Sequence, residues 1–236
     1  MTKSGSGGTR ADEVYARLRT EVLAGRSRPG QRLKFPELIA TYGVSAGVLR
    51  EALGRLVSQG LAQVQPHQGF VVTPLSHSDL RELTAARVDL EVLVFRRAVE
   101  DGDLAWESRV MAAHHLLERT PLHIPDEQDQ LSDEWAAAHA DFHRALLEGC
   151  GNRRLLEMAS SLREEAELYR RWSVSLGNEP DRDVAGEHRA LRDAAVARNP
   201  AEAGRLLAEH IEHTAGLLVT CAVDEHDPGE SSSEVA

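Results

Sequence analysis

Two histidines of one predicted helix have the residue type and spacing of metal ligands. His139 and His143 are four residues apart, so their side chains leave the same helical face. Trp135, Phe142 and Leu146 lie on that face as well, which predicts that it points into a hydrophobic core. Neutral imidazole is the commonest protein ligand of zinc, nickel and similar ions, so a divalent metal is one use for this pair.

Two further histidines lie on apolar helical stripes later in the chain. His188 aligns with Leu191 and Ala195, and His210 aligns with Leu206. A buried imidazole needs either a hydrogen-bond partner or a metal. Spacing alone leaves both readings open, a four-histidine metal site or hydrogen-bonded core histidines. Three other histidines are expected at the helix surface: His114, His115 and His213.

These four histidines lie in a region whose pattern is helical throughout. From Ser76 onward we expect no strand, and Pro and Gly separate the helical segments. The loops are short, which favours antiparallel packing of neighbours in a bundle. The predicted helices are 77–101, 103–119, 127–149, 152–176, 181–198 and 200–223.

The first part of the chain follows a different pattern. Residues 11–25 read as a helix, Pro36 begins a second, and Ser45 is a good N-cap for a third that ends near Gly60. A change to alternating residues then predicts a two-stranded hairpin that ends near Thr73. Three helices followed by a hairpin outline a winged helix-turn-helix.

The sequence therefore predicts a mainly α protein with two domains. We expect a winged helix-turn-helix over residues 11–75 and an all-α antiparallel bundle over 76–223, with disordered ends at 1–10 and 224–236.

The charge distribution separates the same two parts. The chain of 236 residues carries a net charge of -11, yet residues 1–75 contain ten Lys/Arg and only five Asp/Glu. That gives the first part +5 and leaves -16 for the rest. A basic head on an acidic body fits a protein that places only its head against DNA phosphates.

Composition argues against export and membrane insertion. No apolar run is long enough to span a bilayer, and the first residues lack the apolar core of a secretory signal. The two cysteines, Cys150 and Cys221, lack the spacing of a metal or redox motif. We therefore expect a cytoplasmic protein without a disulfide scaffold.

Several motifs together identify a family resemblance. The strings VYARLRTEVLAGRSRPGQRL, LIATYGVSAGVLREALGRLVSQGLAQV and HQGFVV resemble the DNA-binding head of the GntR family. The later strings RELTAARVDLE, DFHRALLEGCGN and EHRALRDAAVARNPAEAGRLLAEH resemble the FCD effector domain of its FadR subfamily. The resemblance covers residues 11 to 220 and implies a dimeric transcription factor, usually a repressor. A small metabolite would release it from near-palindromic operator DNA.

Within that resemblance, the third helix is the one that reads DNA. Its N-terminal residues would face base edges in the major groove, Arg50 would reach phosphate or guanine, and the glycine of the wing would allow close approach to the minor groove. The predicted DNA contacts are Ser45, Ala46, Gly47, Arg50, Arg55, Lys34, His67 and Gly69.

Two positions depart from the family pattern in the head. Pro36 stands where many relatives have an arginine or another polar residue, and Ala46 stands where many have an arginine. Two phosphate or base contacts are therefore missing, for which Arg32 and Lys34 can compensate. We expect an operator that differs from the commonest half-site of the family.

The resemblance also implies a metal site. The family pattern of an aspartate and three histidines matches at His143, His188 and His210, but the aspartate position is His139. An all-nitrogen set favours zinc or nickel over manganese or magnesium. Such a metal would be non-catalytic and would bind the carboxylate of an effector, which Arg87 could pair with. A surface ion pair is the alternative role of Arg87.

Two other functions remain open at this point. One keeps the DNA-binding head but replaces the metal with an acyl or other apolar effector. The other is a helical-bundle metalloenzyme, although the chain has no Glu-x-x-His pair and no His-Glu-x-x-His motif. An enzyme would also leave the head unexplained.

Overall fold

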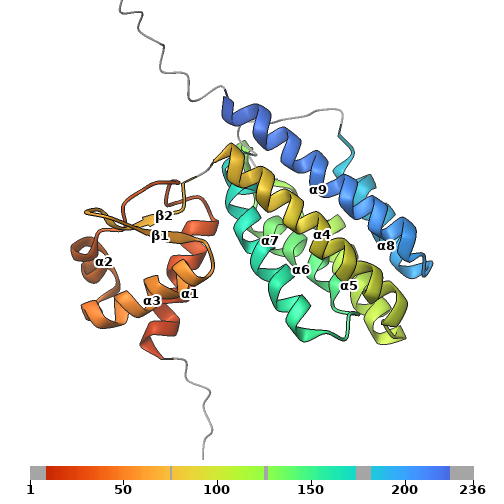
Figure 1. Ribbon diagram of the computed structural model, residues 1–236, viewed down its shortest axis with the longest axis horizontal. Helices are drawn as coiled ribbons and strands as arrows, with labels where there is room; N and C mark the ends of the chain where they lie inside the picture. Colours follow the sequence, from red (N-terminus) through yellow and green to blue (C-terminus); the bar gives the residue numbers. More distant parts are fainter. Residues whose placement is uncertain (1–8, 75, 125–126, 174–181, 224–236) are drawn as a thin grey trace, which may run out of the picture.

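The computed structural model describes residues 9–74, 76–124, 127–173 and 182–223. The predicted disordered ends lie outside this part, except that Thr9 and Arg10 belong to the start of the first helix. The division predicted at residues 75 and 76 falls between the last strand of the head and the first helix of the bundle. Figure 1 shows the head beside a larger group of helices.

The head is a winged helix-turn-helix built from α1 (Arg10–Leu23), α2 (Phe35–Tyr42), α3 (Ala46–Ser58), β1 (Ala62–Gln65) and β2 (Gly69–Val72). The strands pair antiparallel with Ala62 opposite Val72, and Arg32 forms an isolated antiparallel bridge with Val71.

Local signals fix the boundaries of the head helices as the sequence predicts. Pro36 stands in the first turn of α2, and Gly43 ends that helix in the left-handed conformation, φ 61°. The Ser45 side chain accepts a hydrogen bond from the backbone N–H of Val48 at the start of α3. The core beneath these helices contains Leu18, Leu49, Leu53, Leu56 and Leu61, all at most 2% exposed.

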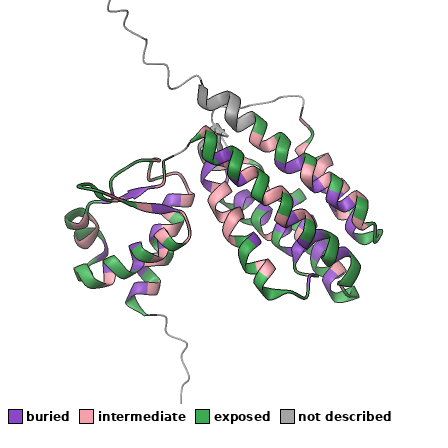
Figure 2. Cartoon of the chain, in the orientation of Figure 1, coloured by how far each residue is buried: buried purple, intermediate pink, exposed green. Residues whose placement is uncertain are grey.

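The bundle contains α4 (His77–Asp101), α5 (Leu104–Arg119), α6 (Asp133–Leu147), α7 (Arg153–Ser173), α8 (Val184–Val196) and α9 (Pro200–Val223). Helix α4 packs against α9 and α7, while α5 packs against α6 and α8. The indole N–H of Trp106 donates to the Ala145 carbonyl oxygen at 2.8 Å and ties α5 to α6. Buried positions line the helical faces that point toward one another (Figure 2).

One feature of the bundle contradicts the sequence prediction. The strands β3 (His123–Ile124) and β4 (Glu127–Leu131) form a short antiparallel hairpin, so the helix predicted over 127–149 begins only at Asp133. The residues of β4 are mostly polar and show no strand alternation, so pairing with β3 decides their conformation. Ser132 accepts a hydrogen bond from the backbone N–H of Trp135 and thereby fixes the helix start.

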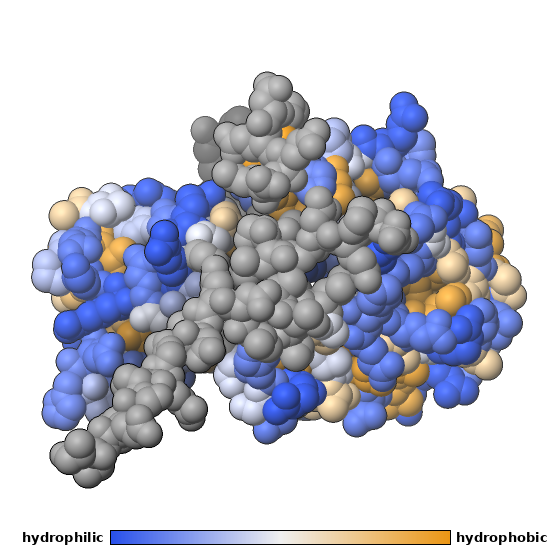
Figure 3. Space-filling model, turned by 90° about the horizontal axis from the view of Figure 1, so that it is seen from above, coloured by the Kyte–Doolittle hydropathy of each residue, from blue (hydrophilic) through white to orange (hydrophobic). Residues whose placement is uncertain are grey.

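The coloured part of the face in Figure 3 is mainly hydrophilic, with separate hydrophobic patches among the hydrophilic side chains. No helix in the described ranges is long and apolar enough to cross a bilayer.

Candidate metal centre and DNA-binding surface

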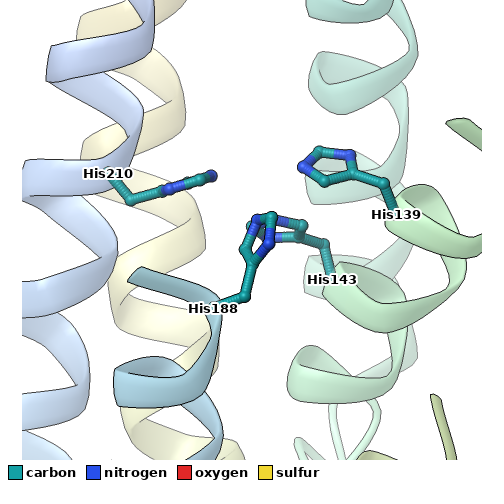
Figure 4. A group of neighbouring side chains, drawn as sticks. All are labelled: His139, His143, His188 and His210. Carbon is teal, nitrogen blue, oxygen red and sulfur yellow. The ribbon is translucent and has the colours of Figure 1, made fainter. Parts of the chain in front are cut away.

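The fold brings the four predicted histidines together. His139 and His143 come from α6, His188 from α8 and His210 from α9, and all four are buried. One ring nitrogen of each lies within 4.8 Å of the corresponding nitrogens of the others. The four side chains point toward one another in Figure 4.

Three of these histidines have a ring nitrogen without a hydrogen-bond partner. The atoms are His139 Nδ1, His143 Nε2 and His188 Nε2, and within the described part of the chain nothing satisfies them. An unsatisfied buried polar atom costs about 1–3 kcal/mol. Hydrogen-bonded core histidines would not show this arrangement, whereas a metal ion would satisfy all three nitrogens at once. The residues present therefore fit a metal.

The fourth histidine is oriented by a carboxylate. His210 Nδ1 lies 2.7 Å from Oε2 of Glu187, which leaves Nε2 as the ring nitrogen available to a metal. Arg182 donates two hydrogen bonds to the same carboxylate, at 2.7 and 2.8 Å. Although burial opposes ionisation, the hydrogen bonds from Arg182 and His210 hold the pKa of Glu187 below its ordinary value. Carboxylate partners of this kind commonly fix the tautomer of a metal-binding histidine.

Burial keeps the cluster neutral. Desolvation lowers the pKa of His139, His143 and His188 well below the ordinary value, and the nearby cations Arg163 and Arg170 lower it further for the two α6 histidines. The neutral ring is the form that binds metal.

Aromatic residues hold the rings in place. Trp135 stacks on His139 with ring centres 4.8 Å apart, and the Phe142 edge contacts His143 and His188. This confirms the prediction that the α6 face with Trp135, Phe142 and Leu146 points inward.

A buried ion-pair group lies beside the cluster. Arg87 Nε is 2.6 Å from Oε1 of Glu91, and Arg163 donates to Oε2 of the same carboxylate at 3.0 Å. Glu91 is 0% exposed, and despite that burial the two arginines hold its pKa below the ordinary value. Arg87 is thus in an ion pair, though beneath the surface. Sequence reasoning missed Arg163, because the charged residues around it in α7 read as a solvated face.

One expected surface histidine is buried. His114 is 2% exposed, and its Nδ1 lies 3.1 Å from the Arg192 guanidinium, whereas His115 and His213 are exposed as predicted. His114 shares the inward face of α5 with Val110 and Leu117, so the helix carries it into the core.

The residues predicted to read DNA lie at the exposed start of α3. Ala46 and Gly47 form its first turn and are exposed, and Ser45 caps it. Arg50 is exposed, with its guanidinium 5.6 Å from the ring centre of Phe35.

The remaining predicted contacts fall into two groups. His67 (φ 64°) and Gly69 (φ 76°) are exposed at the tip of the wing, while Lys34 is exposed and pairs with Glu37 at 2.9 Å. Arg55 differs, because it pairs with Asp12 of α1 and its guanidinium lies 3.8 Å from the Tyr15 ring centre. The charge of Arg55 is therefore paired within the head in this structure.

Both parts of the chain match family models. Residues 10–72 match the bacterial regulatory proteins of the gntR family, and residues 82–213 match the FCD domain. The chain belongs to the GntR family. Its FCD domain places it in the FadR subfamily, which consists of DNA-binding transcriptional regulators and not of enzymes.

Sequence and structure comparisons with known proteins support this family assignment. The chain is 38% identical over 207 residues to the HTH-type transcriptional regulator BphR of Paraburkholderia xenovorans (strain LB400), covering 88% of this chain and 84% of that protein. It is 33% identical to the HTH-type transcriptional repressor GlaR of Escherichia coli (strain K12), covering 84% and 90%. The solved structure of E. coli McbR/YncC superposes with a TM-score of 0.74 at 22% identity, covering 91% of this chain and 99% of that one, which supports the fold.

Proposed function

We propose that this GntR/FCD regulator is a homodimeric repressor whose bundle binds a metal through four histidines and senses a small carboxylate there. The observation that carries the proposal is a buried cluster of four histidines, of which three have a ring nitrogen without a hydrogen-bond partner in the described part of the chain. The relative GlaR is itself named a transcriptional repressor, which supports this direction of regulation.

The proposed metal is zinc or nickel. His139, His143, His188 and His210 offer four neutral nitrogens and no carboxylate, and that donor set suits these metals better than manganese or magnesium. A metal held only by neutral rings keeps its full positive charge, which attracts a carboxylate.

Arg87 is the proposed second contact of the effector. Its side chain is only 15% exposed, and its guanidinium already pairs with one carboxylate, that of Glu91. The remaining N–H groups of a guanidinium can donate hydrogen bonds to a second carboxylate. An effector carboxylate that binds the metal and lies near Arg87 would contact both cations.

The proposed DNA contacts follow from exposure and position. The start of α3, with Ser45, Ala46, Gly47 and Arg50, would enter the major groove. His67 and Gly69 of the wing would approach the minor groove, and Lys34 would contact phosphate. In a dimer, two such helices would bind half-sites about one turn of DNA apart.

Metal analysis tests the centre. We expect about one zinc or nickel ion per chain in protein purified without chelator. The double variant His143→Ala/His188→Ala should lose it, while the control His67→Ala/His115→Ala, which removes two exposed histidines, should retain it. Equal metal content in both double variants would contradict the proposal. A metal-free wild type would turn the effector search to acyl or other apolar ligands.

A screen on the metal-loaded protein tests the effector class. Small mono- and dicarboxylates should raise the unfolding temperature of the zinc-loaded wild type and lower its affinity for DNA. Arg87→Gln should weaken both effects without loss of zinc. Neutral analogues in which an amide replaces the carboxylate serve as the control ligands.

A further inference from the structure

Two turns of α7, residues 163–170, contact three parts of the molecule from three sides. Positions 163, 167 and 170 share one helical face, positions 164, 165 and 168 a second, and positions 166 and 169 a third. Each face has its own neighbours, and together they connect the histidine cluster with the head.

The first face borders the histidine cluster. Arg163 reaches the buried carboxylate of Glu91, and its charge acts on both α6 histidines. Arg170 lies over the ring of Trp135, 5.4 Å from the ring centre, and that ring stacks on His139. A change in charge or ring position at the cluster therefore acts directly on this side of α7.

The second face forms part of the head. Leu168 is 1% exposed and belongs to the hydrophobic core of the head, although it comes from the bundle. Glu164 pairs with Arg19 of α1 at 2.9 Å. Glu165 lies against Gly60, where a Cβ atom would come within 2.7 Å of its side chain.

The third face holds the connection between the domains. The Tyr169 hydroxyl donates to the Asp79 carboxylate at 2.6 Å and accepts from the backbone N–H of Ser76 at 3.3 Å. Ser76 caps α4, the helix that follows the head. The start of the bundle is therefore fixed to the same two turns.

Beside these contacts, a groove separates part of the head from the bundle. A groove of about 570 Å³ lies between α1, α6 and α7, with Thr20 and Leu23 on one side and Ala137 and Ala140 on the other. Arg26, just after α1, and Asp133, at the start of α6, form an exposed pair at 3.8 Å. An exposed pair of this kind contributes little, so the buried contact of Leu168 with the head is the stronger of these two contacts.

We propose that residues 163–170 of α7 couple the state of the histidine cluster to the position of the head, and so to DNA affinity. The inference rests on the proposed function for the identity of the signal, a metal with its effector. Binding that shifts Arg163 and Arg170 displaces Leu168 within the core of the head. Coupling of this kind requires that the signal favour one head position over another.

The test compares DNA affinity with and without zinc. The probe is a duplex selected from a random library for binding to the zinc-free wild type, and zinc affinity is measured in parallel. We expect zinc to change wild-type DNA affinity at least about fivefold, the lower end of common allosteric couplings. In Leu168→Ala this ratio should fall to nearly one, while zinc affinity is unchanged. Leu155→Ala, the same change at a half-buried position of α7 that packs against the bundle core, should retain the wild-type ratio.

A second arm does not need a metal. Arg163→Gln alters the face of α7 that borders the histidine cluster. On its own it should change DNA affinity. When Leu168→Ala is also present, Arg163→Gln should cause no further change. Should Leu168→Ala fail to fold, Glu164→Gln breaks the pair with Arg19 and replaces it in both arms.

The two proposals can fail separately. If the wild type binds no zinc, the metal centre is wrong, and the Arg163→Gln arm alone decides the coupling. If Leu168→Ala or its replacement leaves either effect on DNA affinity intact, α7 is not the coupling element. The same conclusion holds if neither zinc nor Arg163→Gln changes DNA affinity in the wild type.

Discussion

Replacing one cluster histidine with leucine should stabilise the metal-free protein. His143 is 2% exposed, and its Nε2 has no hydrogen-bond partner in the described part of the chain. Its removal eliminates a desolvation cost of about 1–3 kcal/mol, while a change of similar volume costs less than about 1.5 kcal/mol in repacking. We expect His143→Leu to gain about 1 kcal/mol, or about 2–4 °C in melting temperature for a chain of this size.

Zinc should reverse that order. A ligand that binds only the folded state stabilises that state by about 4 kcal/mol when its free concentration is about 1,000 times its dissociation constant. The wild type should gain this amount, and His143→Leu should gain much less. Calorimetric melting of both proteins, first in chelator and then in excess zinc, measures the two differences.

His114→Leu is the matched control. That histidine is equally buried, at 2% exposed, but its Nδ1 accepts a hydrogen bond from Arg192. Its loss should leave the metal-free protein unchanged or less stable, and zinc should stabilise the variant as it does the wild type. If His143→Leu instead lowers metal-free stability by more than about 1 kcal/mol, the cluster is a satisfied core and the metal reasoning fails.

Three further predictions follow from the same contacts. Folding lowers the pKa of the cluster histidines, so on acidification the unfolded chain takes up protons before the folded chain does. As the pH decreases from about 6.5, the free energy of unfolding of the metal-free protein should therefore decrease by up to about 1.4 kcal/mol per pH unit for each histidine. Urea unfolding at a series of pH values measures this decrease. Glu187→Gln should weaken zinc binding about 10–100-fold in a competition titration, while Glu209→Gln on the exposed side of α9 should not; equal affinities would contradict the orienting role. Arg50→Ala should cost about 1–3 kcal/mol in DNA binding by fluorescence anisotropy, against no loss for exposed Arg154→Ala, and an unchanged Kd would exclude Arg50 from the contact surface.

Short-range signals in the sequence were sufficient for the head and for most helices of the bundle. Ser45, Pro36 and Gly43 act through their own backbone neighbours, so their roles could be read directly from the chain. The β3–β4 hairpin could not be read in this way, because its strands are short and their pairing, not their residue types, determines the conformation.

The same limit applies to the candidate centre. The four histidines could be identified from helical faces and a family pattern, and the fold brings them together. Arg163 could not, because its partner Glu91 is 72 residues away and the residues around it are charged. His114 was misplaced because its helical neighbours include both apolar and exposed positions.

Leu168 has a consequence for how such regulators can be recombined. Because this bundle residue completes the hydrophobic core of the head, residues 11–75 do not form a self-contained module. A chimera that joins this head to another bundle would leave a cavity where Leu168 lies, unless the new helix supplied a similar side chain at that place. New pairings of DNA-binding heads and sensors in this architecture are therefore constrained by a helix that lies outside the proposed DNA contacts and supplies no histidine of the cluster.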